Sequence, residues 1–262
     1  KKYNIDGVIN FAAETHVDNS ISDPEIFIKT NVNGVFNLLN TCYKFWMIKP
    51  NKPKLRFRHA RFHQISTDEI YGSIDKGSFT EESNYSPNSP YSASKSSADM
   101  LVRSYNKTFG LDTTTSVSSN NFGPNQDLEK FIPKIIFNGI NNLKIPVYGN
   151  GLNIRNWIFV SEHCKAIDLI FNKAPSGSKY NIGSKNEFSN LQIIEKISKI
   201  LSEKYDYESI LNKINFIKDR EGHDLRYSIN SEKILNDFQW QSYLNFEDCI
   251  DLTIQSILKN NN

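Results

Sequence analysis

The chain has 262 residues, enough to bury a sizeable core in one or two domains. Its 31 Lys and Arg nearly balance 29 Asp and Glu, so nothing indicates a nucleic-acid-binding surface. No apolar run approaches the ~18 residues that a membrane span needs, so we expect no membrane contact. Cys42, Cys164 and Cys249 lack paired spacing, which argues against a disulfide framework or metal site and favours a cytoplasmic protein.

The first half of the chain alternates predicted strands and helices. Residues 7–12 are typical of a buried parallel strand, and a helical pattern follows from Asp23-Pro24 to about Trp46. The basic, proline-broken stretch 49–61 predicts a surface loop. The elements expected next are strand 62–66, a polar loop at 72–89, a helix at 91–109 and strand 113–117. Such alternation predicts a doubly wound parallel sheet.

The pattern changes after Gly123-Pro124. Strand and helix segments interleave from there on, so we expect a smaller α/β lobe with a ragged boundary. Its expected elements are a helix around 129–141, strands 145–148 and 157–160, a helix capped by Ser161 that runs to about 172, a strand end at 180–183, an amphipathic helix at 189–204, strand 214–217 and further helix to about 259.

Two polar motifs lie close together in this order. Ser66-Thr67-Asp68-Glu69 ends strand 62–66, and Ser89-Pro90 begins a helix that places Tyr91 and Lys95 on one face. Either motif alone is more often structural, a capping turn or a tyrosine on a solvated face. Because ligands of open α/β sheets bind beyond the carboxyl ends of strands, the two together predict a site. There, the Lys95 ammonium should lower the pKa of Tyr91 towards that of a usable base.

These motifs resemble the extended short-chain dehydrogenase/reductases, and among them most closely the nucleotide-sugar 4,6-dehydratases. The similarity runs in order through essentially the whole chain. It rests on Ser66–Gly72 and Tyr91-x-x-x-Lys95, and on the runs Ala12–Asp18, Ser119–Pro124, Arg155-x-Trp157, Tyr180–Gly183 and Asp219–His223. It implies a Rossmann-like sheet in residues 1–124, which would hold NAD and the catalytic residues, and a mainly substrate-binding lobe in residues 125–262.

The resemblance also implies a reaction on a nucleotide-linked glucose such as dTDP-glucose. The sugar is oxidised at C4, loses water across C5 and C6, and is reduced at C6, with NAD as the cofactor. Tyr91 with Lys95 would serve the oxidation and Thr67 would bind the hydroxyl. Glu69 would be the base at C5 and Asp68, kept protonated beside Glu69, the acid at C6.

The remaining site residues also come from the resemblance. Those for NAD are Phe11, Ala12, Ala13, Glu14, Thr15, Thr30 and Asn121, together with Tyr91 and Lys95. Those for the substrate are Thr15, Thr67, Asn120, Lys130, Phe131, Ile132, Pro133, Lys134, Ile135, Pro146, Val147, Tyr148, Arg155, Asn190, Asp219, Arg220, Glu221, Gly222 and His223. Arg155 and Arg220 would clamp the diphosphate. His16 and His163 are assigned no catalytic role.

The chain departs from the family pattern in places. It contains no Gly-x-x-Gly-x-x-Gly run, so we expect it to begin about two βα units into the family fold and to lack the family's C-terminal tail. Thr15 replaces a usual serine, and Glu221 replaces a usual proline. Three alternatives therefore stay open: an epimerase or decarboxylase on the same scaffold, a non-catalytic nucleotide-sugar-binding remnant, and a structural subunit. The family also implies a homodimer that pairs through a four-helix bundle.

Overall fold

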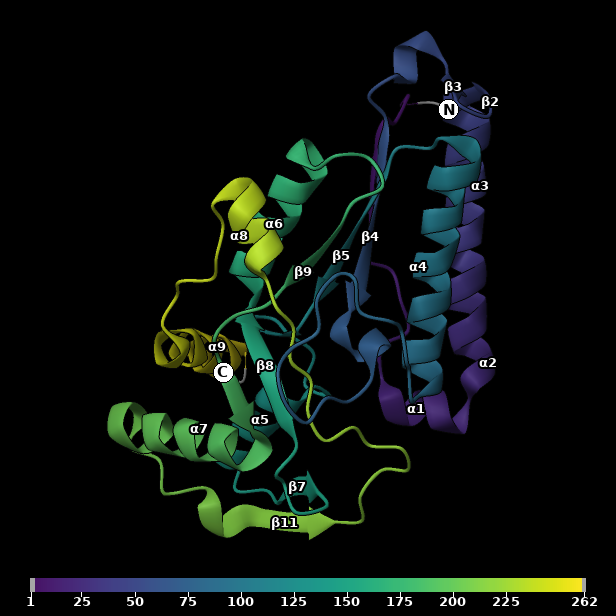
Figure 1. The fold of residues 1–262 in the computed structure, drawn as a ribbon. Helices are drawn as coiled ribbons and strands as arrows, with labels where there is room; N and C mark the ends of the chain where they lie inside the picture. The colour runs from purple at the N-terminus through teal and green to yellow at the C-terminus, as the bar shows by residue number, and fades with distance from the viewer. Residues whose placement is uncertain (1–2, 261–262) are drawn as a thin grey trace.

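Figure 1 shows the computed structural model, which describes residues 3–260. Its main sheet has four parallel strands, β1 (Gly7–Asn10), β4 (Arg61–Thr67), β5 (Thr113–Ser118) and β9 (Lys179–Ile182), in the order β1-β4-β5-β9. The register pairs Phe62 with Thr113 and Thr67 with Ser118. The carboxyl ends of β4 and β5 therefore lie side by side, and the predicted Rossmann-like sheet is confirmed.

Helices cover both faces of this sheet (Figure 1). On one face α3 (Gly34–Trp46) and α4 (Pro90–Phe109) share a buried cluster with Phe62 of β4. On the other face α6 (Val160–Lys173) and α8 (Glu232–Phe238) pack on Ile65 of β4. The sheet is thus buried on both sides, as expected for doubly wound parallel strands.

A second apolar core lies beyond the main sheet, among α5 (Phe131–Ile140), α7 (Asn190–Tyr205) and α9 (Phe246–Asn260). Beside it β7 (Ile145–Tyr148) pairs in parallel with β11 (Ile214–Ile217). Strand β8 (Ile154–Phe159) runs between β10 (Glu187–Ser189) and β6 (Asn120–Phe122), which follows β5 closely in the chain. The two cores are thus joined next to the carboxyl ends of the main strands.

The predicted start of α4 is confirmed in detail. Ser89 is the N-cap, its hydroxyl accepts from the Ser92 backbone N–H, and the Ser92 hydroxyl accepts from the Ser89 N–H. Pro90 takes the first helical position, where its missing N–H costs nothing. This capping box fixes the orientation of the first turns, which carry Tyr91 and Lys95.

The long helical pattern before the second strand is interrupted by a wider turn. Helix α2 (Pro24–Phe27) leads into a π-helical segment, η1 (Ile28–Asn33), and then into α3. Buried Asn31 in that segment accepts from the Glu14 backbone N–H, and donates to the Glu14 carbonyl and to the Ser94 hydroxyl on α4. The segment after β1 is therefore fastened to the helix that carries Tyr91.

Several local predictions are wrong. Stretch 49–61 is not a plain loop, because β2 (Met47–Lys49) pairs with β3 (Lys52–Pro53) and a 3-10 turn, η2 (Leu55–Phe57), buries Phe57 in the core. Ser161 is not an N-cap, because α6 begins one residue earlier, directly after β8. Residues 218–231 are not helical but form a segment that pairs with Ile154 on β8.

The sequence analysis also missed the short helix α1 (Val17–Ser22) and strands β6 and β10. Each has six residues or fewer, too few for a hydrophobic period to be visible. Across residues 3–260, none of the helices has the length and apolar character needed to cross a membrane.

A capping substitution tests how α7 is held on the second core. The Ser189 hydroxyl accepts from the Gln192 N–H, and the Gln192 side chain accepts from the Ser189 N–H. Ser189→Ala should lower the free energy of unfolding by about 1 kcal/mol, measured by urea unfolding. Ser104→Ala, on the exposed face of α4, is the matched control and should stay within about 0.5 kcal/mol of the wild type. Equal effects of the two changes would contradict a capping role.

Candidate active site

A cavity of about 500 Å³ opens between the carboxyl ends of β4 and β5 and the second lobe. Every residue predicted to be catalytic contributes to its wall: Thr67, Asp68, Glu69, Tyr91 and Lys95. The carboxylates therefore do not point into bulk water. The two motifs face the same space, as their order in the chain predicts.

A tight turn places the two carboxyl groups. Strand β4 ends at Thr67, and η3 (Asp68–Tyr71) is a 3-10 turn whose Glu69 N–H donates to the Thr67 hydroxyl at 3.4 Å. Gly72 ends the turn at a φ of +80°, where a Cβ would lie 2.4 Å from the Ser86 carbonyl oxygen. Only glycine fits there without moving the backbone. The turn thereby directs Asp68 and Glu69 into the cavity.

Asp68 is a buried carboxyl group, with 2% of its surface exposed. Burial raises its pKa to about 8, the adjacent Glu69 adds to this rise, and Arg155 opposes it. Its Oδ2 has no hydrogen-bond partner among residues 3–260. Burial also raises the pKa of Glu69, against the lowering effect of Arg155 and Arg220. At neutral pH Asp68 is therefore an uncharged acid with a proton to donate into the cavity.

Tyr91 and Lys95 behave differently from the prediction. Burial raises the pKa of Tyr91 well above its ordinary value, and the negative charge of Glu69 raises it further. Lys95 does not offset this rise, since it is not among the groups that lower the pKa of Tyr91, and its ammonium group donates to the Ile65 carbonyl oxygen at 2.7 Å. The predicted lowering of the Tyr91 pKa by Lys95 is therefore wrong for the chain without ligand. Close packing around the phenol outweighs the neighbouring amine.

Asp99 is a charged residue of the site region that the sequence analysis missed. It lies one turn beyond Lys95 on α4, is 4% exposed, and its Oδ2 accepts from the Ser66 hydroxyl at 2.5 Å. Burial raises its pKa to about 6, and the interaction with Ser66 opposes that rise. Its charge favours the protonated form of Lys95, whose pKa burial lowers. The spacing 91, 95, 99 along one helical stripe was the available signal.

The residues predicted for NAD are only partly gathered here. Phe11, Ala13, Thr15 and Asn121 line the cavity with Tyr91 and Lys95, whereas Ala12, Glu14 and Thr30 do not. Glu14 is held instead through its backbone by Asn31. Seven buried polar atoms of the lining have no hydrogen-bond partner among the described residues: His16 Nδ1, Asp68 Oδ2, Ser119 Oγ, Asn120 Oδ1, Asn121 Oδ1, Gln126 Oε1 and His163 Nε2. These atoms offer unused hydrogen bonds to a ligand.

The residues predicted for the substrate divide in the same way. Those that line the cavity are Thr15, Thr67, Asn120, Lys130, Phe131, Arg155, Arg220, Glu221, Gly222 and His223. Three others, Ile132, Ile135 and Val147, lie in the second apolar core. Also outside the lining are Pro133, Lys134, Pro146, Tyr148, Asn190 and Asp219. The stretch 130–135 splits because α5 begins at the cavity with Lys130 and Phe131, and its helical turn then directs Ile132 and Ile135 into the core and Lys134 to solvent.

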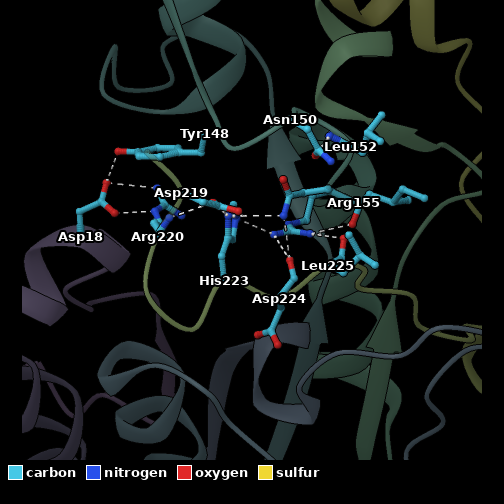
Figure 2. Close-up of polar contacts among 12 residues, drawn as sticks. Asp18, Tyr148, Asn150, Leu152, Arg155, Asp219, Arg220, His223, Asp224 and Leu225 are labelled. Carbon is cyan, nitrogen blue, oxygen red and sulfur yellow. Dashed lines mark hydrogen bonds and ion pairs between the residues drawn. The ribbon is translucent and has the colours of Figure 1, made fainter. Parts of the chain in front are cut away.

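Arg155 is fixed in place by its backbone contacts. It is 8% exposed, and it donates to the carbonyl oxygens of Ile154, Asp224 and Leu225, as Figure 2 shows. Its guanidinium lies 4.2 Å from the ring centre of Tyr227. A cation held this rigidly is suited to a fixed anionic group of a ligand.

His223 lies between Arg155 and Asp219 and contacts both side chains. Its Nε2 lies 3.1 Å from Arg155 Nη2, and its Nδ1 lies 2.6 Å from Asp219 Oδ1 (Figure 2). Because arginine only donates, Nε2 must accept and Nδ1 must carry the proton given to Asp219. Burial and the two nearby arginines lower the pKa of His223, which favours this neutral form.

Other lining residues were not predicted. They are His16, Val17, Ile65, Ser66, Ser89, Ser118, Ser119, Gln126, Glu129, Val160, His163, Asp224 and Tyr227. Five of them lie in elements that were missed or mispredicted: Val17 in α1, Val160 and His163 at the start of α6, and Asp224 and Tyr227 in segment 218–231. His16 and His163, for which no catalytic role was expected, both lie at the cavity.

An acidic pair at a strand end and a tyrosine–lysine helix, on a doubly wound sheet, define the dehydrogenase-like class of nucleotide-sugar enzymes. The chain matches the family described as GDP-mannose 4,6 dehydratase over residues 1–253. It belongs to this family.

Similar proteins include several dTDP-glucose 4,6-dehydratases. That of Xanthomonas campestris pv. campestris is 41% identical over 259 residues, which cover 97% of this chain and 73% of the relative. Among solved structures, the dTDP-glucose 4,6-dehydratase of Streptomyces venezuelae, with NAD and TYD bound, has a TM-score of 0.88 at 35% identity and covers 98% of this chain and 74% of its own.

A second solved structure is the dTDP-glucose 4,6-dehydratase of Bacillus anthracis in complex with NAD. It has a TM-score of 0.84 at 38% identity, over 99% of this chain and 75% of its own. The resemblance inferred from the motifs is therefore confirmed along nearly the entire chain.

The raised pKa of Asp68 predicts a stability effect with a definite sign. Between pH 3.8 and about 8 the folded chain retains a proton that the unfolded chain has lost, so Asp68 costs stability that grows with pH. Asp68→Asn should raise the free energy of unfolding by at most about 1.4 kcal/mol per pH unit in that window, levelling off above it. Urea unfolding at a series of pH values measures this.

Asp75→Asn, on the exposed loop after Gly72, is the matched control and should show no such trend. A gain for Asp68→Asn that does not change with pH would mean that Asp68 is ionised in the folded chain.

Proposed function

We propose that this chain is an NAD-dependent dehydratase that converts dTDP-glucose to the 4-keto-6-deoxy sugar. The relatives named above support the reaction type, the substrate and the cofactor. The observation that carries the proposal is the buried, neutral Asp68 beside Glu69, in the cavity that also contains Tyr91 and Lys95. An elimination needs an acid and a base that do not neutralise each other, and this pair supplies both.

The lining fits the nicotinamide end of NAD. The unpartnered atoms of Ser119, Asn121 and His163 offer hydrogen bonds, and Lys95 and Tyr91 lie on the same wall. Bound NAD would supply the hydride acceptor and donor for the sugar, and its positive charge would lower the pKa of Tyr91. The sequence has no glycine-rich turn for the pyrophosphate, so this assignment covers the nicotinamide end alone.

The remaining roles are those that the family resemblance implies, and the positions and charges of the residues are compatible with them. Tyr91 takes the proton of the C4 hydroxyl, which the Thr67 hydroxyl orients. Glu69 removes the proton at C5, and Asp68 gives its proton to the leaving C6 hydroxyl, so that water departs and one double bond forms. The burial of Asp68 keeps its proton available until that step.

Positive groups for the diphosphate lie on the opposite wall, at Arg155, Arg220 and Lys130. This arrangement supports the proposed division of the chain, with residues 1–124 as the cofactor-binding and catalytic part and residues 125–262 as the mainly substrate-binding part. The Asp68–Glu69 pair favours dehydration over epimerisation or decarboxylation, neither of which needs an acid for a leaving C6 hydroxyl.

Turnover tests this proposal directly. The chain, supplied with NAD and dTDP-glucose, should form a 4-keto product that absorbs strongly in alkali. Asp68→Asn and Glu69→Gln should each lower kcat by about 10²–10⁴-fold, because each removes one proton-transfer group. Glu82→Gln, an exposed carboxyl on the polar loop, is the control and should leave kcat unchanged. Formation of the C4 epimer, or dTDP binding without turnover, would overturn the proposal.

We also propose that two copies of the chain pair through α3 and α4, whose exposed faces support a homodimer. The two helices lie side by side at one edge of the molecule (Figure 1), and Phe36 and Met100 are 42% and 53% exposed. Burial of such side chains against a second copy removes apolar surface from water.

A charge placed on this surface tests the pairing. Wild-type protein should have the light-scattering mass of two chains, and Met100→Glu should shift the mass towards one chain, because a buried carboxylate is costly at an interface. Leu211→Glu, at a 43% exposed position in the second lobe, is the control. A wild-type mass of one chain would contradict the pairing.

A further inference from the structure

Two residues from other elements, Asp18 and Tyr148, contact the side chain of Arg220. Its Nε and Nη2 donate to the two carboxylate oxygens of Asp18, at 2.5 and 3.2 Å. The Tyr148 hydroxyl donates to Asp18 at 2.9 Å, and the Tyr148 ring centre lies 4.6 Å from the guanidinium. Figure 2 shows the three side chains together. Arg220 lines the cavity, whereas Asp18 and Tyr148 do not.

This arrangement leaves part of the guanidinium available. Arginine has five N–H donors in a planar fork, and Asp18 engages two of them along the Nε–Nη2 edge. The other edge, with Nη1, is the one a phosphate would meet. Asp18 therefore engages only part of the Arg220 guanidinium, and it fixes the plane in which the other N–H donors lie.

The backbone explains why these residues meet. Parallel strands β7 and β11 pair Tyr148 with Ile217, so the segment that carries Arg220 leaves the pair next to Tyr148. Asp18 comes from α1, directly after Thr15 and His16 of the cavity wall. The contact thus joins the segment after β1 to the segment after β11, both of which contribute residues to the cavity lining.

We propose that Asp18 and Tyr148 are positioning residues that aim Arg220 at the diphosphate of the nucleotide sugar and fasten segment 218–224 across the cavity. This inference rests on the proposed function in taking a nucleotide diphosphate as the ligand. It adds a supporting role to Tyr148, which was predicted to hold the nucleotide itself, because its hydroxyl donates to Asp18 and its ring lies against the Arg220 guanidinium.

Binding of dTDP, measured by titration calorimetry on the full chain, tests the inference without turnover. Asp18→Asn should weaken dTDP about tenfold, because one charge-assisted contact that orients Arg220 is lost. Asp18→Glu keeps the charge and should recover part of the affinity. Glu25→Gln removes the exposed ion pair between Glu25 of α2 and Lys29 of η1 and is the matched control, with unchanged affinity.

A double-mutant cycle separates positioning from a general loss of structure. In the Arg220→Gln background, Asp18→Asn should weaken dTDP no further, because its effect acts through Arg220. With dTDP-glucose as substrate, Asp18→Asn should raise KM and leave kcat within about twofold. Wild-type affinity in Asp18→Asn, or losses that simply multiply in the double variant, would overturn the inference.

Failure of this inference and failure of the proposed function would give different results. If the wild-type chain binds dTDP but forms no 4-keto sugar, the proposed reaction fails while the cycle still tests Asp18. If turnover is normal and Asp18→Asn binds dTDP as the wild type does, only the positioning role is lost.

Discussion

The removal of two adjacent carboxyl groups from water governs the site. A carboxylate moved out of water without compensation is costly, so such a group holds its proton instead. Asp68 does so at the end of β4, where the 3-10 turn leaves it only 2% exposed in the cavity wall. The same burial that costs stability creates an acid beside a base. The burial of these two carboxyl groups therefore costs folding free energy, and the proposed chemistry depends on that burial.

Two contacts between distant segments hold the walls around this pair. Asn31 fastens the segment after β1 to α4, and Asp18 fastens the same region to the segment after β11. Both contacts begin close to the cofactor side of the cavity. A change at either one therefore affects how the catalytic wall and the substrate wall face each other. This explains how residues outside the lining contribute to the site.

Much of the fold and the centre of the site could be predicted from the sequence, and the reasons for the rest are physical. The strand run at 62–66 and the Ser89-Pro90 helix start are local signals, so both were found. Segment 218–231 was mispredicted because pairing with β8 decides its form, and that pairing is non-local. The Tyr91 pKa was mispredicted because sequence spacing gives the distance to Lys95 but not the desolvation. The contact of Asp18 was missed because its partner, Arg220, is remote in the chain, whereas Asp99 was overlooked although it lies one helical turn from Lys95.

The protonation state of Asp68 is the claim on which the account of the site depends. Infrared difference spectroscopy of wild type against Asp68→Asn isolates the carbonyl stretch of that one neutral carboxylic acid. The account predicts that this band is present at neutral pH and disappears in a titration centred near pH 8. Its absence at neutral pH, with a carboxylate band in its place, would contradict a neutral acid in the cavity.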